Sequence, residues 1–151
     1  PSIVEVISEK ENMNVKEVLN VLNKKSGVLG LSEVSSDFRD ITKAIEEGNE
    51  VAKNALEVFA NTVVRFVGAY VAEMNGVDAI AFTAGVGENN QAVRKMVCEQ
   101  LGYLGVSLDE KANEKRREEI MISTPDSKVK VFVIPTNEEL AIARETLELL
   151  S

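Results

Sequence analysis

The 151-residue chain contains no histidine and a single cysteine, Cys98. The lack of histidine excludes imidazole acid–base chemistry and histidine-ligated metals, which leaves oxygen ligands and a hard cation such as Mg²⁺. A single cysteine excludes an internal disulfide and a cysteine metal cluster. Cys98 follows a glycine-rich stretch on a predicted helix, where most thiols are inert apolar side chains.

Positive charge is also scarce: 17 Lys and Arg stand against 25 Asp and Glu, a net charge of −8. This balance argues against a nucleic-acid-binding or membrane-binding surface. The most basic run, residues 111–117, is bracketed by acids and is typical of a solvated helix face. No run approaches the length of a membrane span and no signal peptide opens the chain, so we expect a cytoplasmic protein.

The stretch that organises the chain is residues 78–90, DAIAFTAGVGENN. Residues 79–82 predict a strand buried on both faces. Residues 83–87 then predict a turn, followed by a helix, a layout in which a backbone can approach a nucleotide closely. Without Cβ atoms, Gly85 and Gly87 can take φ > 0 and let a flat ring or a phosphate lie against the main chain. An ordinary tight turn explains the pattern equally well, and the usual dinucleotide fingerprint fails because Asn90 replaces its third glycine.

A second candidate segment is Asp37-Phe38-Arg39. Ser35 or Ser36 is the expected N-cap of the helix that follows, and Asp37 suits the positive end of its dipole. An aromatic ring beside a guanidinium could sandwich a base or hold a phosphate. As an isolated tripeptide, it specifies no ligand.

The last unit repeats the strand–turn–helix layout. Residues 128–134 predict a strand, and Thr136 with Glu139 predicts a capping box on the final helix. Glu138 is not needed for that box. It either complements the helix dipole or faces a ligand beyond the end of a parallel strand, where open α/β sheets bind ligands.

Two strand–turn–helix units joined by helices indicate an α/β layer with parallel strands. Residues 120–123 predict a short edge strand, and residues 51–74 predict a long apolar helix that serves as a core element or as a subunit contact. So small a sheet with so much helix looks incomplete. An unpaired strand edge and exposed apolar helix would favour dimerisation or aggregation of the isolated chain.

Three separated stretches carry a more specific signal: residues 24–41 (KKSGVLGLSEVSSDFRDI), 81–109 (AFTAGVGENNQAVRKMVCEQLGYLGVSLD) and 122–146 (ISTPDSKVKVFVIPTNEELAIARET). Through these three stretches the chain resembles the C-terminal part of acetate kinases, a family that includes propionate and butyrate kinases. The resemblance implies the actin-like, ribonuclease H-like fold of sugar kinases and Hsp70, in which two α/β domains close over ATP. It also implies that two subunits dimerise through their C-terminal domains. Residues 1–151 would then be the C-terminal portion of the nucleotide-binding domain, with the N-terminal domain absent.

The resemblance also implies roles for individual residues. Val86 stands where isoleucine is common in the family, and Glu33 stands where glycine is expected. Glu138 matches the acidic residue that positions Mg²⁺, which favours the ligand role over the dipole role. The residues implied to contact ATP or ADP are Asp37, Phe38, Arg39, Gly85, Val86, Gly87, Glu88 and Asn89.

The implied reaction is reversible, ATP-dependent phosphorylation of acetate to acetyl phosphate. Phosphoryl transfer depends on cations placed around the transferring group, and the family supplies its catalytic histidine, aspartate and further arginines from upstream sequence. No catalytic residue is expected in this chain: Arg94, Arg116 and Arg144 are predicted on solvated helix faces. We therefore expect a homodimer-forming nucleotide half that is inactive alone. The alternatives are a propionate or butyrate kinase fragment and a non-catalytic nucleotide-binding or dimerisation module.

Overall fold

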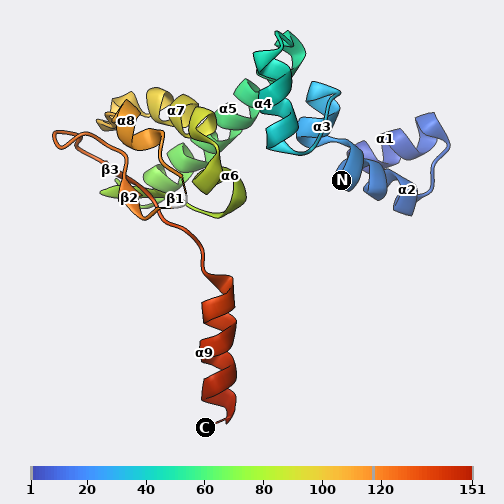
Figure 1. Cartoon of the computed structure of the whole chain (residues 1–151). Helices are drawn as coiled ribbons and strands as arrows, with labels where there is room; N and C mark the ends of the chain where they lie inside the picture. The colour runs from blue at the N-terminus through green and yellow to red at the C-terminus, as the bar shows by residue number, and fades with distance from the viewer. Residues whose placement is uncertain (1, 117, 151) are drawn as a thin grey trace. The chain divides into compact units, whose positions relative to one another are not determined.

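The computed structural model describes residues 2–116 and 118–150. It divides into two compact units, Pro1–Phe59 and Ala60–Ser151, and each unit is described by itself. Helices dominate both units, and the second also holds a small sheet (Figure 1).

The first unit is helical. Its elements are α1 (Ser2–Glu11), α2 (Val15–Asn20), the π-helical turn η1 (Val21–Lys25), α3 (Gly27–Ser32), α4 (Phe38–Glu46) and the first part of α5 (Glu50–Glu73). Small and branched side chains fill its interior, and Phe38 on α4 meets Phe59 on α5 edge-on, with 4.8 Å between ring centroids. The buried apolar residues are Val18, Ile41, Ala52, Ala55 and Leu56.

The second unit contains a three-stranded mixed sheet in the order β1-β3-β2. β1 (Ala79–Phe82) and β3 (Lys130–Val133) are parallel and aligned from Ala79 opposite Lys130 to Phe82 opposite Val133. β2 (Ile120–Met121) pairs antiparallel with β3. The helices of this unit are the second part of α5, α6 (Ala84–Asn89), α7 (Gln91–Gln100), the 3₁₀ turn η2 (Gly102–Leu104), α8 (Glu110–Asn113) and α9 (Glu138–Leu150).

The predicted parallel pair and the short edge strand are confirmed, although β2 is only two residues long. The prediction that residues 79–82 are buried on both faces is wrong. Ala79 and Ala81 are exposed while Ile80 and Phe82 are half-buried, so one face of β1 is open and the other is only partly covered. The core of this unit lies instead under β3 and α7, where Val131, Val133, Val93 and Val97 are buried.

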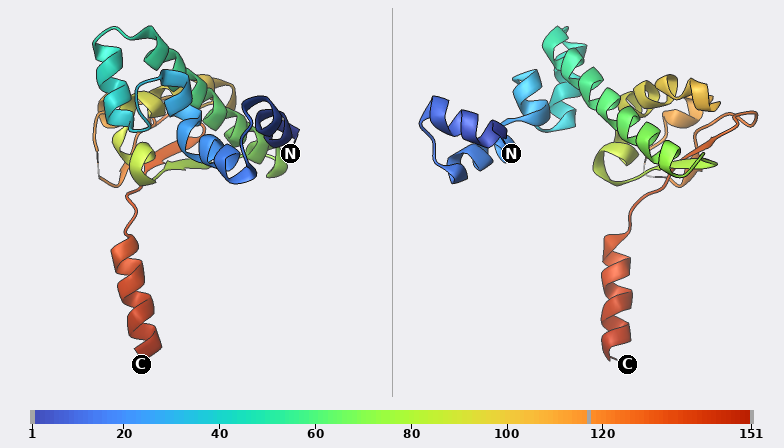
Figure 2. Two further views of the ribbon diagram at one scale, coloured as in Figure 1. Left: turned by 90° about the vertical axis from the view of Figure 1, so that its right-hand side faces the viewer. Right: turned by 180° about the vertical axis from the view of Figure 1, so that it is seen from behind.

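The predicted long helix is present as α5, 24 residues without a break (Figure 2). Contrary to the expectation from sequence, it is long and apolar enough to cross a membrane by length and composition alone. Core helices of soluble proteins share this length and composition. In the first half of α5, Ala52, Ala55 and Leu56 are buried, whereas Phe66 is 61% exposed farther along.

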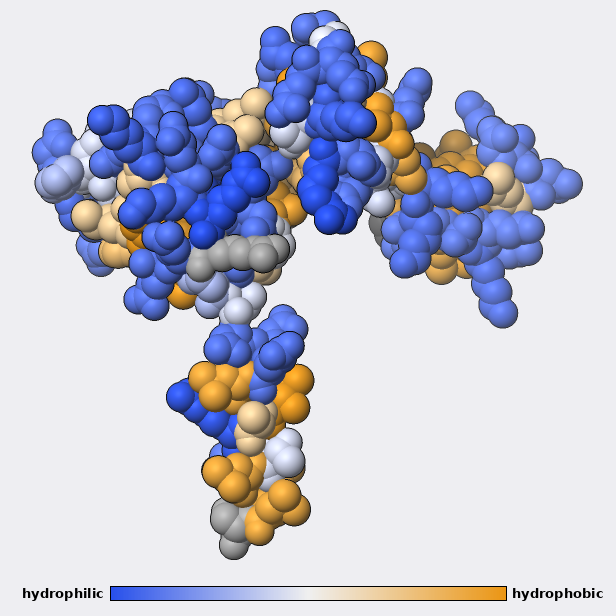
Figure 3. Space-filling view, viewed as in Figure 1, coloured by the Kyte–Doolittle hydropathy of each residue, from blue (hydrophilic) through white to orange (hydrophobic). Residues whose placement is uncertain are grey.

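A second exposed apolar surface lies on α9, none of whose residues is buried. Orange, hydrophobic atoms cover much of this helix in the space-filling view (Figure 3). The large apolar residues exposed there are Leu140, Ile142, Leu147, Leu149 and Leu150. The expected exposure of apolar helix surface is thus observed in the chain.

Candidate nucleotide site

The glycine-rich segment forms a short helix, α6, rather than the predicted open turn. Thr83 is extended (φ −144°), and the only positive φ in the segment belongs to Ala84, at 58°. Gly85 and Gly87 therefore do not use the φ > 0 that glycine allows. The residue with positive φ is instead Ala84, one position before Gly85.

Gly87 allows two segments of the chain to approach each other closely. A Cβ on Gly87 would lie 3.2 Å from the carbonyl carbon of Phe82 and 3.4 Å from its Cα, so the bare backbone lets α6 sit against the end of β1. Gly85 differs: it is exposed, and a Cβ there would meet no heavy atom within 4 Å. Gly85 and the half-buried Val86 thus leave a stretch of backbone that a planar ring could approach.

The side chains at the end of α6 contact the protein itself. Glu88 is 9% exposed, and its Oε1 accepts hydrogen bonds from Thr136 N (2.8 Å) and Thr136 Oγ1 (3.0 Å). Asn89 Nδ2 donates to the Gly85 carbonyl at 2.8 Å. Glu88 therefore ties α6 to the segment after β3, while Asn89 braces the helix from within.

This tie brings two predicted site segments together. Because β1 and β3 are parallel, α6 and the β3–α9 connection both follow carboxyl ends of neighbouring strands, and Ile134 N donates to Phe82 O at 2.9 Å there. Crevices at the carboxyl ends of parallel strands are where open α/β sheets bind ligands.

Arg94 on α7 is the site residue that sequence reasoning missed. It was predicted on a solvated face, yet it is fully buried. Its guanidinium donates to the carbonyls of Gly87 and Glu88 (2.9 Å each) and of Lys115 (3.1 Å), and to both Oδ1 (2.8 Å) and O (2.5 Å) of Asn113. Burial lowers the pKa of Arg94 below its usual value. No sequence signal could have found it, because most of its acceptors are main-chain carbonyls.

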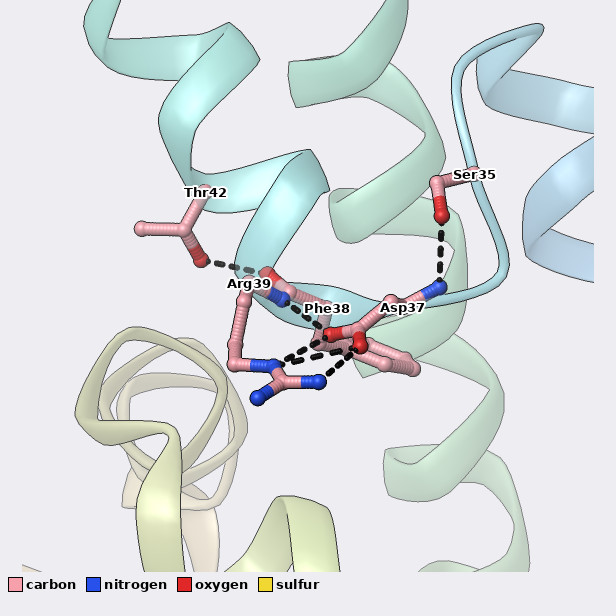
Figure 4. A network of polar contacts seen from close by, with 5 residues as sticks. All are labelled: Ser35, Asp37, Phe38, Arg39 and Thr42. Atoms are coloured by element: carbon pink, nitrogen blue, oxygen red, sulfur yellow. Dashed lines mark hydrogen bonds and ion pairs between the residues drawn. The ribbon is translucent and has the colours of Figure 1, made fainter.

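The Asp37-Phe38-Arg39 segment lies in the first unit, at the start of α4 (Figure 4). Asp37, rather than Ser35 or Ser36, is the N-cap and accepts from Arg39 N at 2.8 Å. Ser35 instead accepts from Asp37 N through its Oγ at 3.0 Å. The Asp37 carboxylate also accepts from Arg39 Nε (3.0 Å) and Nη2 (2.5 Å).

These contacts shift the ionisation of both partners. Hydrogen bonds from the Arg39 side chain, and then from its backbone N–H, lower the pKa of Asp37 to about 2. The same side-chain bond raises the pKa of Arg39. The Arg39 side chain nevertheless remains 90% exposed, so its charge is accessible to a phosphate.

Glu138 is the first residue of α9 and is exposed. The predicted capping box is wrong: Asn137 Oδ1 accepts from Leu140 N at 3.0 Å, while Thr136 is occupied by Glu88. Across residues 2–116 and 118–150, no cluster of three or more acidic, histidine or cysteine side chains could hold a metal. A cluster is not required for Mg²⁺ that binds together with a nucleotide, because one carboxylate is then enough and water and phosphate oxygens supply the other ligands.

Comparison with known proteins identifies the family. Residues 1–144 match the Acetokinase family. Curated relatives include acetate kinases from Lachnoclostridium phytofermentans (59% identical over 150 residues) and Agathobacter rectalis (60% over 151 residues). Each alignment covers 99% of this chain and 38% of the relative. The chain belongs to the acetokinase family and spans well under half the length of these relatives.

Solved structures agree. A crystal structure of Porphyromonas gingivalis acetate kinase superposes with a TM-score of 0.92 at 44% identity, over 100% of this chain and 38% of that one. A propionate kinase from Francisella tularensis gives a TM-score of 0.86 at 39% identity, over 96% of this chain and 37% of that one. The mixed sheet with its helices is therefore an arrangement found in acetate kinase structures.

Proposed function

We propose that this chain supplies the adenine-nucleotide side of an acetate kinase, an ATP-dependent enzyme that reversibly phosphorylates acetate to acetyl phosphate. The observation that carries the proposal is the placement of α6 at the carboxyl ends of β1 and β3 in a chain of the acetokinase family. Named relatives at 59% and 60% identity are acetate kinases, which favours acetate over longer acids.

The exposed backbone at Gly85 and Val86 is the proposed surface for the adenosine. Gly87 supports it by letting α6 pack closely on Phe82, and Glu88 and Asn89 hold the helix in shape. The segment thus acts through its main chain. A flat ring that packs on it gains apolar contact without a side chain having to move.

Within the first unit, Asp37, Phe38 and Arg39 are the residues proposed to contact a nucleotide. The Phe38 ring is fixed by its edge-on contact with Phe59, and Asp37 orients the Arg39 guanidinium through two of its nitrogens. A positioned, exposed guanidinium is suited to bind phosphate oxygens. Phosphate binding would compete with Asp37 for the same donors.

Glu138 is the proposed Mg²⁺-positioning carboxylate. When bound with ATP, the metal would neutralise phosphate charge, and the chain's own contribution would be one carboxylate oxygen at the start of α9. The actin-like fold, a homodimer formed through this region and a cytoplasmic location belong to the same proposal. Since the chain lacks histidine and spans about 38% of its relatives, we propose that it has no kinase activity alone.

Calorimetric titration of ADP into the chain, with and without Mg²⁺, tests the proposal. Arg39→Ala should weaken binding, and Arg144→Ala, at an exposed position on α9, should leave it unchanged. Glu138→Gln should reduce only the Mg²⁺-dependent part. Absence of ADP binding by a chain that circular dichroism shows to be folded would refute the proposed nucleotide site, and acetyl phosphate formation at a normal kinase rate would refute inactivity.

A further inference from the structure

Arg94 uses its whole hydrogen-bonding capacity on neighbouring main chain and one amide. A guanidinium has five N–H donors, and here Nε donates once while Nη1 and Nη2 donate twice each. Two of the acceptors, the carbonyls of Gly87 and Glu88, belong to the glycine-rich segment. Within the described part of the chain, no carboxylate forms an ion pair with Arg94.

A buried cation without a carboxylate partner is costly, and its acceptors must compensate for the water it has lost. The carbonyls of Gly87 and Glu88 are well suited because they lie at the C-terminal end of α6, where the helix dipole is negative and carbonyls lack partners within the helix. The charge therefore bonds the end of α6 more strongly than a neutral donor would.

α6 needs such external support. It has six residues, two of them glycine, and a helix that short does not persist by itself in water. Asn113 completes the connection: its Oδ1 accepts from Arg94, and its Nδ2 donates to the Gln91 carbonyl at 3.1 Å. One buried side chain on α7 thus links α6 to α8.

We propose that Arg94 is a positioning residue that holds α6 in the conformation that accepts the nucleotide. This inference rests on the proposed function, since it assigns Arg94 an effect on a ligand that it does not touch. The geometry calls for arginine specifically. Lysine would keep the charge but carries three donors on a single nitrogen and cannot reach acceptors on both sides of a planar group.

The test compares Arg94→Lys with Arg144→Lys, a matched replacement at an exposed arginine. Hydrogen exchange is followed at the amides of residues 88–90 and at those of α7 and β3, and ADP affinity is measured by calorimetry. We expect Arg94→Lys to speed exchange at residues 88–90 and to weaken ADP binding, each by about tenfold, the effect of losing one charge-assisted hydrogen bond. Exchange in α7 and β3 should change little, and Arg144→Lys should change nothing.

A second pair of variants covers the case in which Arg94→Lys does not fold. Asn113→Ala removes the acceptor of Arg94 Nε, whereas Asn113→Asp keeps an acceptor oxygen there, now on a carboxylate that pairs with the guanidinium, and loses the bond to Gln91. Exchange at residues 88–90 should be faster in the alanine variant than in the aspartate variant.

The outcomes separate this inference from the proposed function. Unchanged exchange at residues 88–90, or an equal rise throughout the second unit, would overturn the positioning role, and so would faster local exchange with unchanged ADP affinity. Failure of the unmodified chain to bind ADP would overturn the proposed function and the effect on the ligand, while the exchange data would still report whether Arg94 holds α6.

Discussion

Replacing Gly87 with alanine should destabilise the chain, whereas the same replacement at Gly85 should not. Both positions lie in α6, where alanine is favoured over glycine by about 1 kcal/mol. At Gly85 the added methyl meets no heavy atom within 4 Å. At Gly87 it would lie 3.2 Å from the carbonyl carbon of Phe82, which is main chain of a paired strand and cannot move without shifting β1.

Overpacking of this kind costs about 1–3 kcal/mol. Because the helix-propensity gain is common to both variants, the stability of Gly87→Ala should fall below that of Gly85→Ala by about that amount. Urea unfolding followed by far-ultraviolet circular dichroism measures the difference, and with slopes of about 1–3 kcal/mol per molar urea the midpoints should differ by roughly 1 M. Equal midpoints would refute the close approach of α6 to β1.

Three further predictions concern ionisable groups. The Asp37 carboxylate should stabilise α4 fully above its ordinary pKa of 3.8, and this stabilisation should be lost as the pH falls through about 2. Carbon NMR titration of Asp37 should show this low midpoint and a higher one in Arg39→Gln, and an unchanged midpoint would contradict the pairing. Burial raises the pKa of the Cys98 thiol to about 12, so iodoacetamide at pH 8 should alkylate it slowly until urea unfolds the chain, and rapid native alkylation would contradict its burial. Glu88→Ala should cost about 1–3 kcal/mol through the lost bonds to Thr136, and Glu88→Gln, which retains an acceptor oxygen, should cost clearly less; equal losses would exclude that contact.

The sequence predicts the elements whose signals are local. The apolar runs before Gly85 and Pro135 correctly predict the parallel pair β1 and β3, and the apolar spacing after residue 51 predicts α5. Each pattern repeats along the element itself, so tertiary contacts are not needed to recognise it.

Long-range hydrogen bonds account for what was not predicted. The segment 84–89 has low helix propensity because of its glycines, and it becomes helical where Arg94 bonds the Gly87 and Glu88 carbonyls. Asn137 caps α9 in place of Thr136, whose N–H and hydroxyl both donate to Glu88, 48 residues away. Local sequence patterns do not predict hydrogen bonds between residues so far apart in the chain.

The order of the strands gives the sheet a single side on which it can be extended. On one side β2 is two residues long, and edge strands that short discourage further pairing. On the other side β1 presents four residues, with the small, exposed Ala79 and Ala81 among them. A strand added to this sheet would therefore pair with β1. Its register against β1 would determine how close the residues that follow it lie to α6.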